Sequence, residues 1–302
     1  MAFIRAAIKL ILRERRVYDY KAPVLCLGVP EIYATFAEFE GWCRAVGGRS
    51  CAISGGDARV TEHRVGRRLG WIDAGTFFKA LGLDEVVTVD LPGAERAPDI
   101  FHDLNEPFPT SMHRRFNLVF DPGSTEHVFD VKTCFTNIVR ALAVDGTAIH
   151  QVPIYSYNGG YFSMNPILLH DFYRANGFAD IRSYIVMWDR YYPYARTSRV
   201  YPYDEVVLSA RHALADRDQV RYSPHLVTFV RKVEERDTIV SPLQFEGHYE
   251  PGGPGRIETT WSRLSAASKA VDQSRWHVLR ALKIRLGRRA RLWRIRRRSF
   301  WL

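Results

Sequence analysis

Short apolar runs alternate with stretches of helical periodicity along most of this 302-residue chain. Runs that are apolar throughout predict buried strands, and a repeat of three to four residues predicts amphipathic helices. The strand-like runs are 24–28, 85–90, 99–104, 116–121, 146–152, 181–188 and 225–233, and the helical stretches are 32–46, 73–81, 132–142 and 166–176. Buried strands separated by helices are typical of a mostly parallel sheet covered on both faces. The pattern therefore predicts one α/β domain over residues 21–236.

Amphipathic helical patterns also lie outside this domain, at both ends of the chain. Residues 1–20 place isoleucines on one stripe with Lys and Arg between them. Residues 237–273 lose the pattern and contain a Gly-Gly-Pro-Gly stretch, which indicates a linker. Residues 274–302 resume a helical repeat of leucines and tryptophan among arginines. We therefore expect helical N- and C-terminal appendages.

The net charge of +10 belongs to these ends. Residues 1–21 contribute +4 and residues 275–302 contribute +11, whereas residues 22–274 hold 26 basic and 31 acidic side chains, a balance of −5. An acidic body argues against a nucleic-acid groove on the folded domain. Basic amphipathic helices with tryptophans suit an anionic membrane surface. Packing of the stripes on the body, and RNA binding by the arginine-rich tail, are the alternatives.

Two further absences bound the class of protein. No run approaches the ~20 apolar residues that span a bilayer. The four cysteines lack the close pairing of a zinc site and are too few for a disulfide framework. We therefore expect no metal and a reducing, cytoplasmic location, with peripheral attachment to the inner face of the cytoplasmic membrane through the basic ends.

Polar residues at the ends of the predicted strands are the candidates for chemistry, because ligands of such sheets bind at the carboxyl ends of strands. Asp90 closes the second strand, where an acid can accept hydrogen bonds from both hydroxyls of a ribose. Asp103 and Leu104 follow the third strand and could meet an adenine. A turn or helix cap at Asp90, and an Asx-turn at Asp103, are the structural alternatives.

The loop after the fourth strand is the richest in functional groups. It contains Asp121, Gly123, Glu126 and His127 within seven residues. Histidine is the side chain best suited to act as a base near neutral pH, and Glu126 could orient it or bind substrate. The alternative is that Glu126 and His127 cap or flank the following helix.

Several strings between residues 86 and 178 give the sequence a specific resemblance. They are His-Asp-Leu-Asn-Glu-Pro at 102–107, Glu-His-Val-Phe at 126–129, and a Tyr-Phe element at 161–162 before a helix that ends in Asn-Gly-Phe at 176–178. These strings resemble bacterial methyltransferase-like proteins of surface-glycan and lipopolysaccharide gene clusters, which are class I S-adenosylmethionine (SAM)-dependent methyltransferases. The resemblance implies a Rossmann-like, seven-stranded, mostly parallel sheet whose last strand is inserted antiparallel.

The resemblance also implies roles for individual residues. The ribose of SAM would lie at Asp90, the adenine at Asp103 and Leu104, and the methionine portion near Gly28 and the turn from Asp121 to Gly123. Glu126 and His127 would face the transferred methyl group, with His127 as the base. His150 and Tyr161 would line the acceptor pocket.

Two departures from the family pattern keep other functions open. The loop after the first strand, residues 27–31, has Gly28 as its single glycine, and Gly159 stands where relatives carry histidine. The expected function is methylation of a hydroxyl on a glycan or lipid-linked sugar. The alternatives are a catalytically inactive methyltransferase-like protein that scaffolds glycan assembly, and an RNA methyltransferase recruited by the arginine-rich tail.

Overall fold

The computed structural model describes residues 2–48, 50–92, 97–155, 159–189, 198–203 and 222–242, together with the backbone of 300–301. Its elements are β1 (Ala2–Phe3), α1 (Arg5–Glu14), β2 (Val24–Leu27), β3 (Glu31–Ile32), α2 (Phe36–Trp42), the π-helix η1 (Cys43–Gly47), the 3-10 helix η2 (Gly55–Asp57), α3 (Arg64–Leu69), α4 (Ala74–Ala80), β4 (Val86–Asp90), β5 (Ile100–Phe101), the 3-10 helix η3 (Thr110–Met112), β6 (Phe116–Asp121), the 3-10 helix η4 (Thr125–His127), α5 (Val131–Ala141), β7 (Leu142–Pro153), α6 (Pro166–Ala175), β8 (Phe178–Asp189), β9 (Arg199–Pro202), β10 (Tyr222–Lys232) and β11 (Phe300–Trp301).

One mixed sheet organises the fold. Within the described residues it has nine strands in the order β11-β9-β8-β10-β7-β6-β2-β4-β5. The five strands from β7 to β5 are parallel neighbours. Strand β10 lies between β7 and β8 and is antiparallel to both, which confirms the expected antiparallel insertion of the last domain strand. The sheet exceeds the predicted seven strands because β9 and β11 extend it beyond β8.

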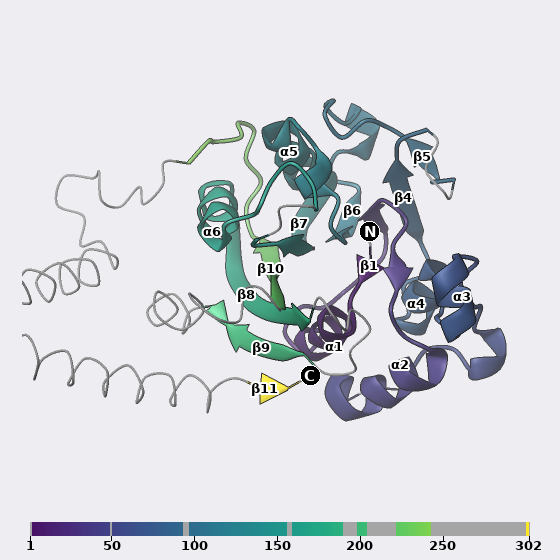
Figure 1. Ribbon diagram of the computed structural model, residues 1–302. Helices are drawn as coiled ribbons and strands as arrows, with labels where there is room; N and C mark the ends of the chain where they lie inside the picture. Colours follow the sequence, from purple (N-terminus) through teal and green to yellow (C-terminus); the bar gives the residue numbers. More distant parts are fainter. Residues whose placement is uncertain are drawn as a thin grey trace, which may run out of the picture.

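Both faces of the central strands β2 and β6 are buried, as the uniformly apolar runs predict. Side chains alternate along a strand, so Val24 and Cys26 of β2 face one core cluster while Leu25 and Leu27 face the other. Helices α1, α2 and α4 contribute to the first cluster, and α5 and α6 contribute to the second. Figure 1 shows α5 and α6 on one side of the strands and α1 on the other.

The N-terminal helix belongs to the core of the domain. Ile8 and Ile11 of α1 are fully buried against the sheet, and burial of each contributes about 1.5–3 kcal/mol. Glu14 is 2% exposed and accepts hydrogen bonds from Tyr184 at 2.7 Å and Arg182 at 3.3 Å, both on β8. Of the two apolar stripes expected to face a membrane, the one on α1 therefore faces the sheet instead.

The segment between the first two domain strands differs most from its prediction. The expected helix over residues 32–46 begins only at Phe36, because β3 comes first and a capping box between Thr35 and Glu38 starts α2. Residues 47–70, to which the sequence pattern assigns neither strand nor helix, contain the short helix α3. The third strand shrinks from six residues to the two of β5.

The predicted linker and C-terminal helix lie largely outside the residues that the structure describes. Most of the expected C-terminal helix, 274–302, and most of the linker, 237–273, fall beyond the described residues, and residues 300–301 form strand β11 instead of helix. Among the helices that are described, none combines the length and hydrophobicity needed to cross a bilayer.

Candidate functional site

The carboxyl ends of three neighbouring parallel strands form the candidate site. Strand β2 lies between β6 and β4, with Cys26 beside Phe120 and Leu27 beside Val89. The residues that end or follow these strands therefore meet at one edge of the sheet. They are Gly28 after β2, Asp90 at the end of β4 and Asp121 at the end of β6.

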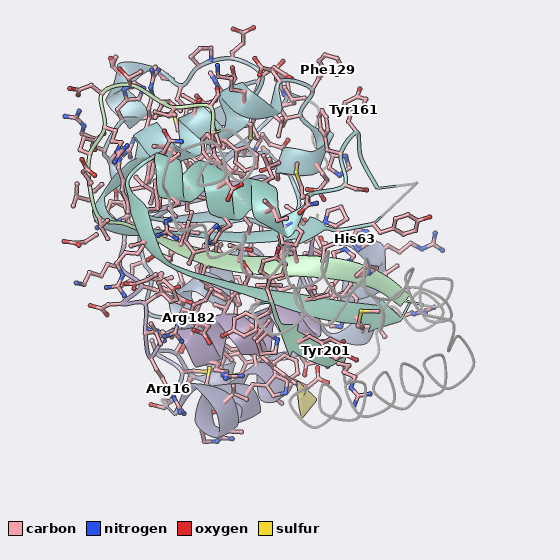
Figure 2. All side chains as sticks on the ribbon, turned by 90° about the vertical axis from the view of Figure 1, so that its left-hand side faces the viewer. Arg16, His63, Phe129, Tyr161, Arg182 and Tyr201 are labelled. Atoms are coloured by element: carbon pink, nitrogen blue, oxygen red, sulfur yellow. The ribbon has the colours of Figure 1, made fainter. Side chains whose placement is uncertain are left out.

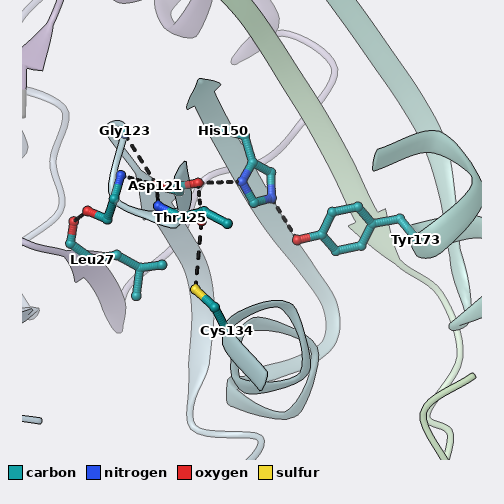
Figure 3. A network of polar contacts seen from close by, with 8 residues as sticks. Leu27, Asp121, Gly123, Thr125, Cys134, His150 and Tyr173 are labelled. Atoms are coloured by element: carbon teal, nitrogen blue, oxygen red, sulfur yellow. Dashed lines mark hydrogen bonds and ion pairs between the residues drawn. The ribbon is translucent and has the colours of Figure 1, made fainter. Parts of the chain in front are cut away.

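Asp121 holds the turn that leaves β6. It is fully buried and accepts hydrogen bonds from the backbone N–H groups of Gly123 (3.2 Å), Ser124 (2.8 Å) and Thr125 (3.2 Å), and from the Thr125 hydroxyl (2.5 Å). Gly123 has a φ of +99°, which favours glycine. The Ser124 hydroxyl donates to the carbonyl of Leu27 and ties the turn to β2 (Figure 3).

A buried polar chain runs from this turn across the sheet to α6 (Figure 3). Nδ1 of His150 lies 2.8 Å from Oδ2 of Asp121, and Nε2 of His150 lies 2.6 Å from the hydroxyl of Tyr173. All three side chains are fully buried. Burial raises the pKa of Tyr173, so its hydroxyl keeps its proton and can donate to Nε2 while Nδ1–H donates to Asp121. His150, expected as a wall of the acceptor pocket, therefore lies inside the core.

Electrostatics agree with this role for Asp121. Burial alone would raise the pKa of its carboxyl, but the hydrogen bond from His150, with the bonds from Thr125 and Ser124, holds that pKa below its usual value. Asp121 is therefore ionised at neutral pH. Its two oxygens already accept the bonds that order the turn and His150, so it supports the site rather than facing a ligand.

Glu126 differs from Asp121 because part of its carboxyl is unsatisfied. The residue is 6% exposed, and its Oε2 has no hydrogen-bond partner among the described residues. Burial, followed by the charge of Asp121, raises its pKa to about 8. At neutral pH the carboxyl thus carries a proton and can act as a hydrogen-bond donor.

Two glycines make room for Glu126. A Cβ added to Gly123 would lie 2.9 Å from Oε1 of Glu126. A Cβ added to Gly160, which has a φ of +125°, would lie 2.7 Å from the Glu126 carbonyl oxygen and 2.9 Å from its Cγ. That carbonyl also accepts hydrogen bonds from the N–H groups of Tyr161 (2.8 Å) and Phe162 (3.2 Å). The loop after β7 therefore rests directly on η4 and helps to bury the carboxyl.

The same loop brings Tyr161 to the rim of the site, beside the segment that carries His127. The rings of Phe129 and Tyr161 meet edge to face at 5.9 Å, and they are 75% and 70% exposed. Figure 2 shows both at the upper edge of the molecule. His127 is also exposed, and partial burial is the main cause that lowers its pKa. A neutral imidazole at this position can accept a proton.

The residues expected around adenine and ribose differ from one another in burial and in hydrogen bonding. Asp90 is half-buried, and its Oδ1 accepts from the N–H of Leu91 at 2.8 Å. Asp103 forms an Asx-turn by accepting from the backbone and side-chain N–H groups of Asn105, which lower its pKa, although its carboxylate is exposed. The Leu104 side chain lies in the core, and the Gly28 N–H donates to the Val89 carbonyl at 2.6 Å. Of these residues, Asp90 and Asp103 keep ligand-accessible groups.

Two residues that complete the site were missed in the sequence. Tyr173 lies within the string that carries the resemblance, but only its position on the buried face of α6 links it to His150. Gly160 follows Gly159, the position of a departure from the family pattern, whereas its close approach to Glu126 depends on the folded path of the loop.

Comparison with known proteins adds little to this geometry. No known protein family and no curated protein matches the chain. Solved structures that resemble it include the 1,6-didemethyltoxoflavin-N1-methyltransferase of Burkholderia thailandensis with 1,6-didemethyltoxoflavin and S-adenosylhomocysteine bound (16% identity, TM-score 0.35, covering 76% of this chain and 80% of that chain). A SAM-dependent methyltransferase from Archaeoglobus fulgidus is 12% identical, with a TM-score of 0.39 over 76% of this chain and 94% of that chain. Phosphoethanolamine N-methyltransferase 2 of Haemonchus contortus, in complex with phosphomonomethylethanolamine and S-adenosylhomocysteine, is 12% identical, with a TM-score of 0.36 over 75% of this chain and 52% of that chain. Similarities at these TM-scores carry no weight for the activity of this chain.

Proposed function

We propose that the chain is a SAM-dependent methyltransferase that acts on a hydroxyl of a glycan or lipid-linked sugar. The sheet supports this proposal, because its antiparallel β10 stands between β7 and β8 as the resemblance implies for class I methyltransferases. The adjacent carboxyl ends of β2, β4 and β6 support it too, since ligands of such sheets bind at that edge.

The observation that carries the proposal is the unsatisfied carboxyl of Glu126. A buried polar atom without a partner is costly, so one that persists at a candidate site points to a ligand that satisfies it. SAM carries a positive charge and several hydrogen-bonding groups. A buried carboxyl can interact with the positive charge or form hydrogen bonds with those groups. Asp90 fits the ribose, because its carboxylate is half-exposed at the end of β4. The buried Leu104 side chain and the occupied Gly28 N–H fit less well.

The chemistry follows from what each residue can do. Bound SAM would supply an electrophilic methyl group, which would pass to the acceptor oxygen with S-adenosylhomocysteine as the leaving group. Asp90 would accept hydrogen bonds from the ribose of the cofactor, and Glu126 would form a hydrogen bond with its methionine portion. His127 would take the proton of the acceptor hydroxyl, which a neutral and exposed imidazole can do. The exposed rings of Phe129 and Tyr161 would position the acceptor.

Calorimetric titration with SAM and with S-adenosylhomocysteine tests the proposal. We expect micromolar binding that Asp90→Ala weakens about 100-fold, because two hydrogen bonds to a charged group contribute roughly 3 kcal/mol. Asp84→Ala is the matched control, since Asp84 is exposed and lies two residues before the start of β4, at the opposite end from Asp90. Absence of binding to either ligand in a folded sample would overturn the proposal, as would equal affinities for the Asp90 variant and the parent.

One observation favours a second candidate, a methyltransferase-like protein without catalysis. The loop after β2 offers few donors to a cofactor, because Pro30 has no N–H and the Gly28 N–H already donates to β4. Strand β3, which follows at once, pairs with β1 and fixes the path of the loop. A folded protein that binds neither ligand would favour this candidate.

The cytoplasmic, membrane-proximal location remains part of the proposal. It rests on the basic residues of 275–302, since the apolar stripe of α1 is buried against the sheet. Deleting 275–302 should move the protein from the membrane fraction to the soluble fraction, and unchanged partitioning would contradict the anchoring role.

A further inference from the structure

Two cysteines face each other in the segment between β2 and β4. Cys43 is the first residue of η1, and Cys51 follows the turn that ends it. Their sulfur atoms are 3.2 Å apart and both are free thiols. A disulfide needs the two sulfurs at about 2.05 Å, so a shift of roughly 1 Å would bring them to bonding distance. We propose that Cys43 and Cys51 are the site of a reversible intramolecular disulfide.

The backbone on each side of the pair is anchored to a different helix. A Cβ added to Gly47 would lie 3.6 Å from Leu12 of α1, and the Gly47 carbonyl accepts a hydrogen bond from Arg16 at 3.5 Å. On the other side, the N–H of Ala52 donates to the Ala80 carbonyl of α4 at 3.0 Å. These contacts hold the thiols toward each other without requiring the chain to reorganise. The disulfide would join the part of the segment that rests on α1 to the part that rests on α4.

The thiols differ in exposure, and this difference sets the order of the reaction. Cys43 is buried and Cys51 is partly exposed, so Cys51 meets a small oxidant first. Its thiolate attacks a low-molecular-weight disulfide such as glutathione disulfide, releasing one glutathione and leaving a mixed disulfide. The Cys43 thiolate then attacks the sulfur of Cys51 and releases the second glutathione. Two protein thiols are oxidised, one glutathione disulfide is reduced, and the two thiol protons end on the two glutathiones.

Burial makes the reaction slow at neutral pH. It raises the pKa of both thiols, and thiolate is the attacking species. Cys26 and Cys134 provide internal controls, because both are buried elsewhere in the core. They should resist both oxidation and alkylation in the folded protein.

Mass spectrometry of the full chain after treatment with glutathione disulfide at mildly alkaline pH tests the proposal. Unreacted thiols are alkylated, and cleavage by trypsin together with a glutamate-specific protease places Cys26, Cys43 and Cys51 in three different peptides unless a disulfide joins two of them. We expect that cross-linked pair, its loss after reduction, and a melting temperature about 5 °C higher than that of the reduced protein, since a short closed loop restricts the unfolded chain.

Cys51→Ser is the matched variant. It should show neither the cross-link nor the oxidation-dependent rise in melting temperature. Persistent glutathione on Cys51 without the cross-link would overturn the proposal. So would two thiols that are still free to be alkylated after unfolding, or a cross-link that involves Cys26 or Cys134.

Discussion

Replacing Glu126 by Gln should remove a pH dependence that this one carboxyl gives to the stability of the protein. The folded pKa of Glu126 is about 8, whereas the ordinary value is 4.5. Below pH 4.5 the group is protonated in both states, and its contribution to stability is fully present. Between these values only the folded state keeps the proton, so the free energy of unfolding falls by about 1.4 kcal/mol for each pH unit. The contribution is lost by the time the pH has passed the folded pKa.

Urea unfolding of the parent protein and of Glu126→Gln at several values from about pH 5 to about pH 8 measures this effect. Glutamine keeps the shape of the protonated acid but does not titrate. The difference in unfolding free energy should therefore shift in favour of the variant by about 4 kcal/mol across this range. Glu62→Gln, at an exposed position, is the control and should track the parent. Parallel curves for the parent and Glu126→Gln would refute the reasoning.

Two further variants test a buried cation and the candidate base. Lys232 is fully buried and donates hydrogen bonds to the carbonyls of Val139 and Leu142 at the end of α5. Lys232→Met should therefore lower the free energy of unfolding, measured with urea, by about 2 kcal/mol or more. Lys132→Met, on the exposed side of the same helix, should change it little, and equal effects of the two variants would contradict the capping role. His127→Ala should slow methyl transfer about 100-fold or more while SAM affinity is retained, and unchanged turnover would exclude His127 as the base.

Local pattern was sufficient to find most elements of the domain. The predicted strand 116–121 agrees with β6 at both ends, and the helix expected over 166–176 ends one residue early. These segments were predictable from local sequence. An apolar run bounded by turn residues indicates a buried strand, and an apolar repeat every three to four residues that ends at glycine indicates an amphipathic helix. The sequence also predicted that the candidate residues after these strands would lie at one edge of the sheet, since parallel strands bring their carboxyl ends together.

The pattern could not show which surface each apolar face packs against, or which distant side chains come into contact. The isoleucine stripe of α1 has the spacing of a membrane-surface helix, yet the same spacing suits a helix that covers a sheet. Likewise, nothing local connects His150 to Tyr173, which are 23 residues apart and lie on a strand and a helix. The burial of Glu126 depends on the loop that carries Gly160. Such contacts are tertiary, and periodicity along the chain does not encode them.

The acids at the strand ends illustrate why position alone does not assign a role. Asp121 and Asp90 both end parallel strands of the sheet. Asp121 is fully buried, and its oxygens accept bonds from the turn and from His150, so its replacement would disturb the loop that carries Glu126. Asp90 is half-exposed, and a ligand can reach its carboxylate. Because the first acid builds the site and the second can bind at it, cofactor affinity should be tested first at Asp90, where a loss of binding is not confounded by a loss of structure.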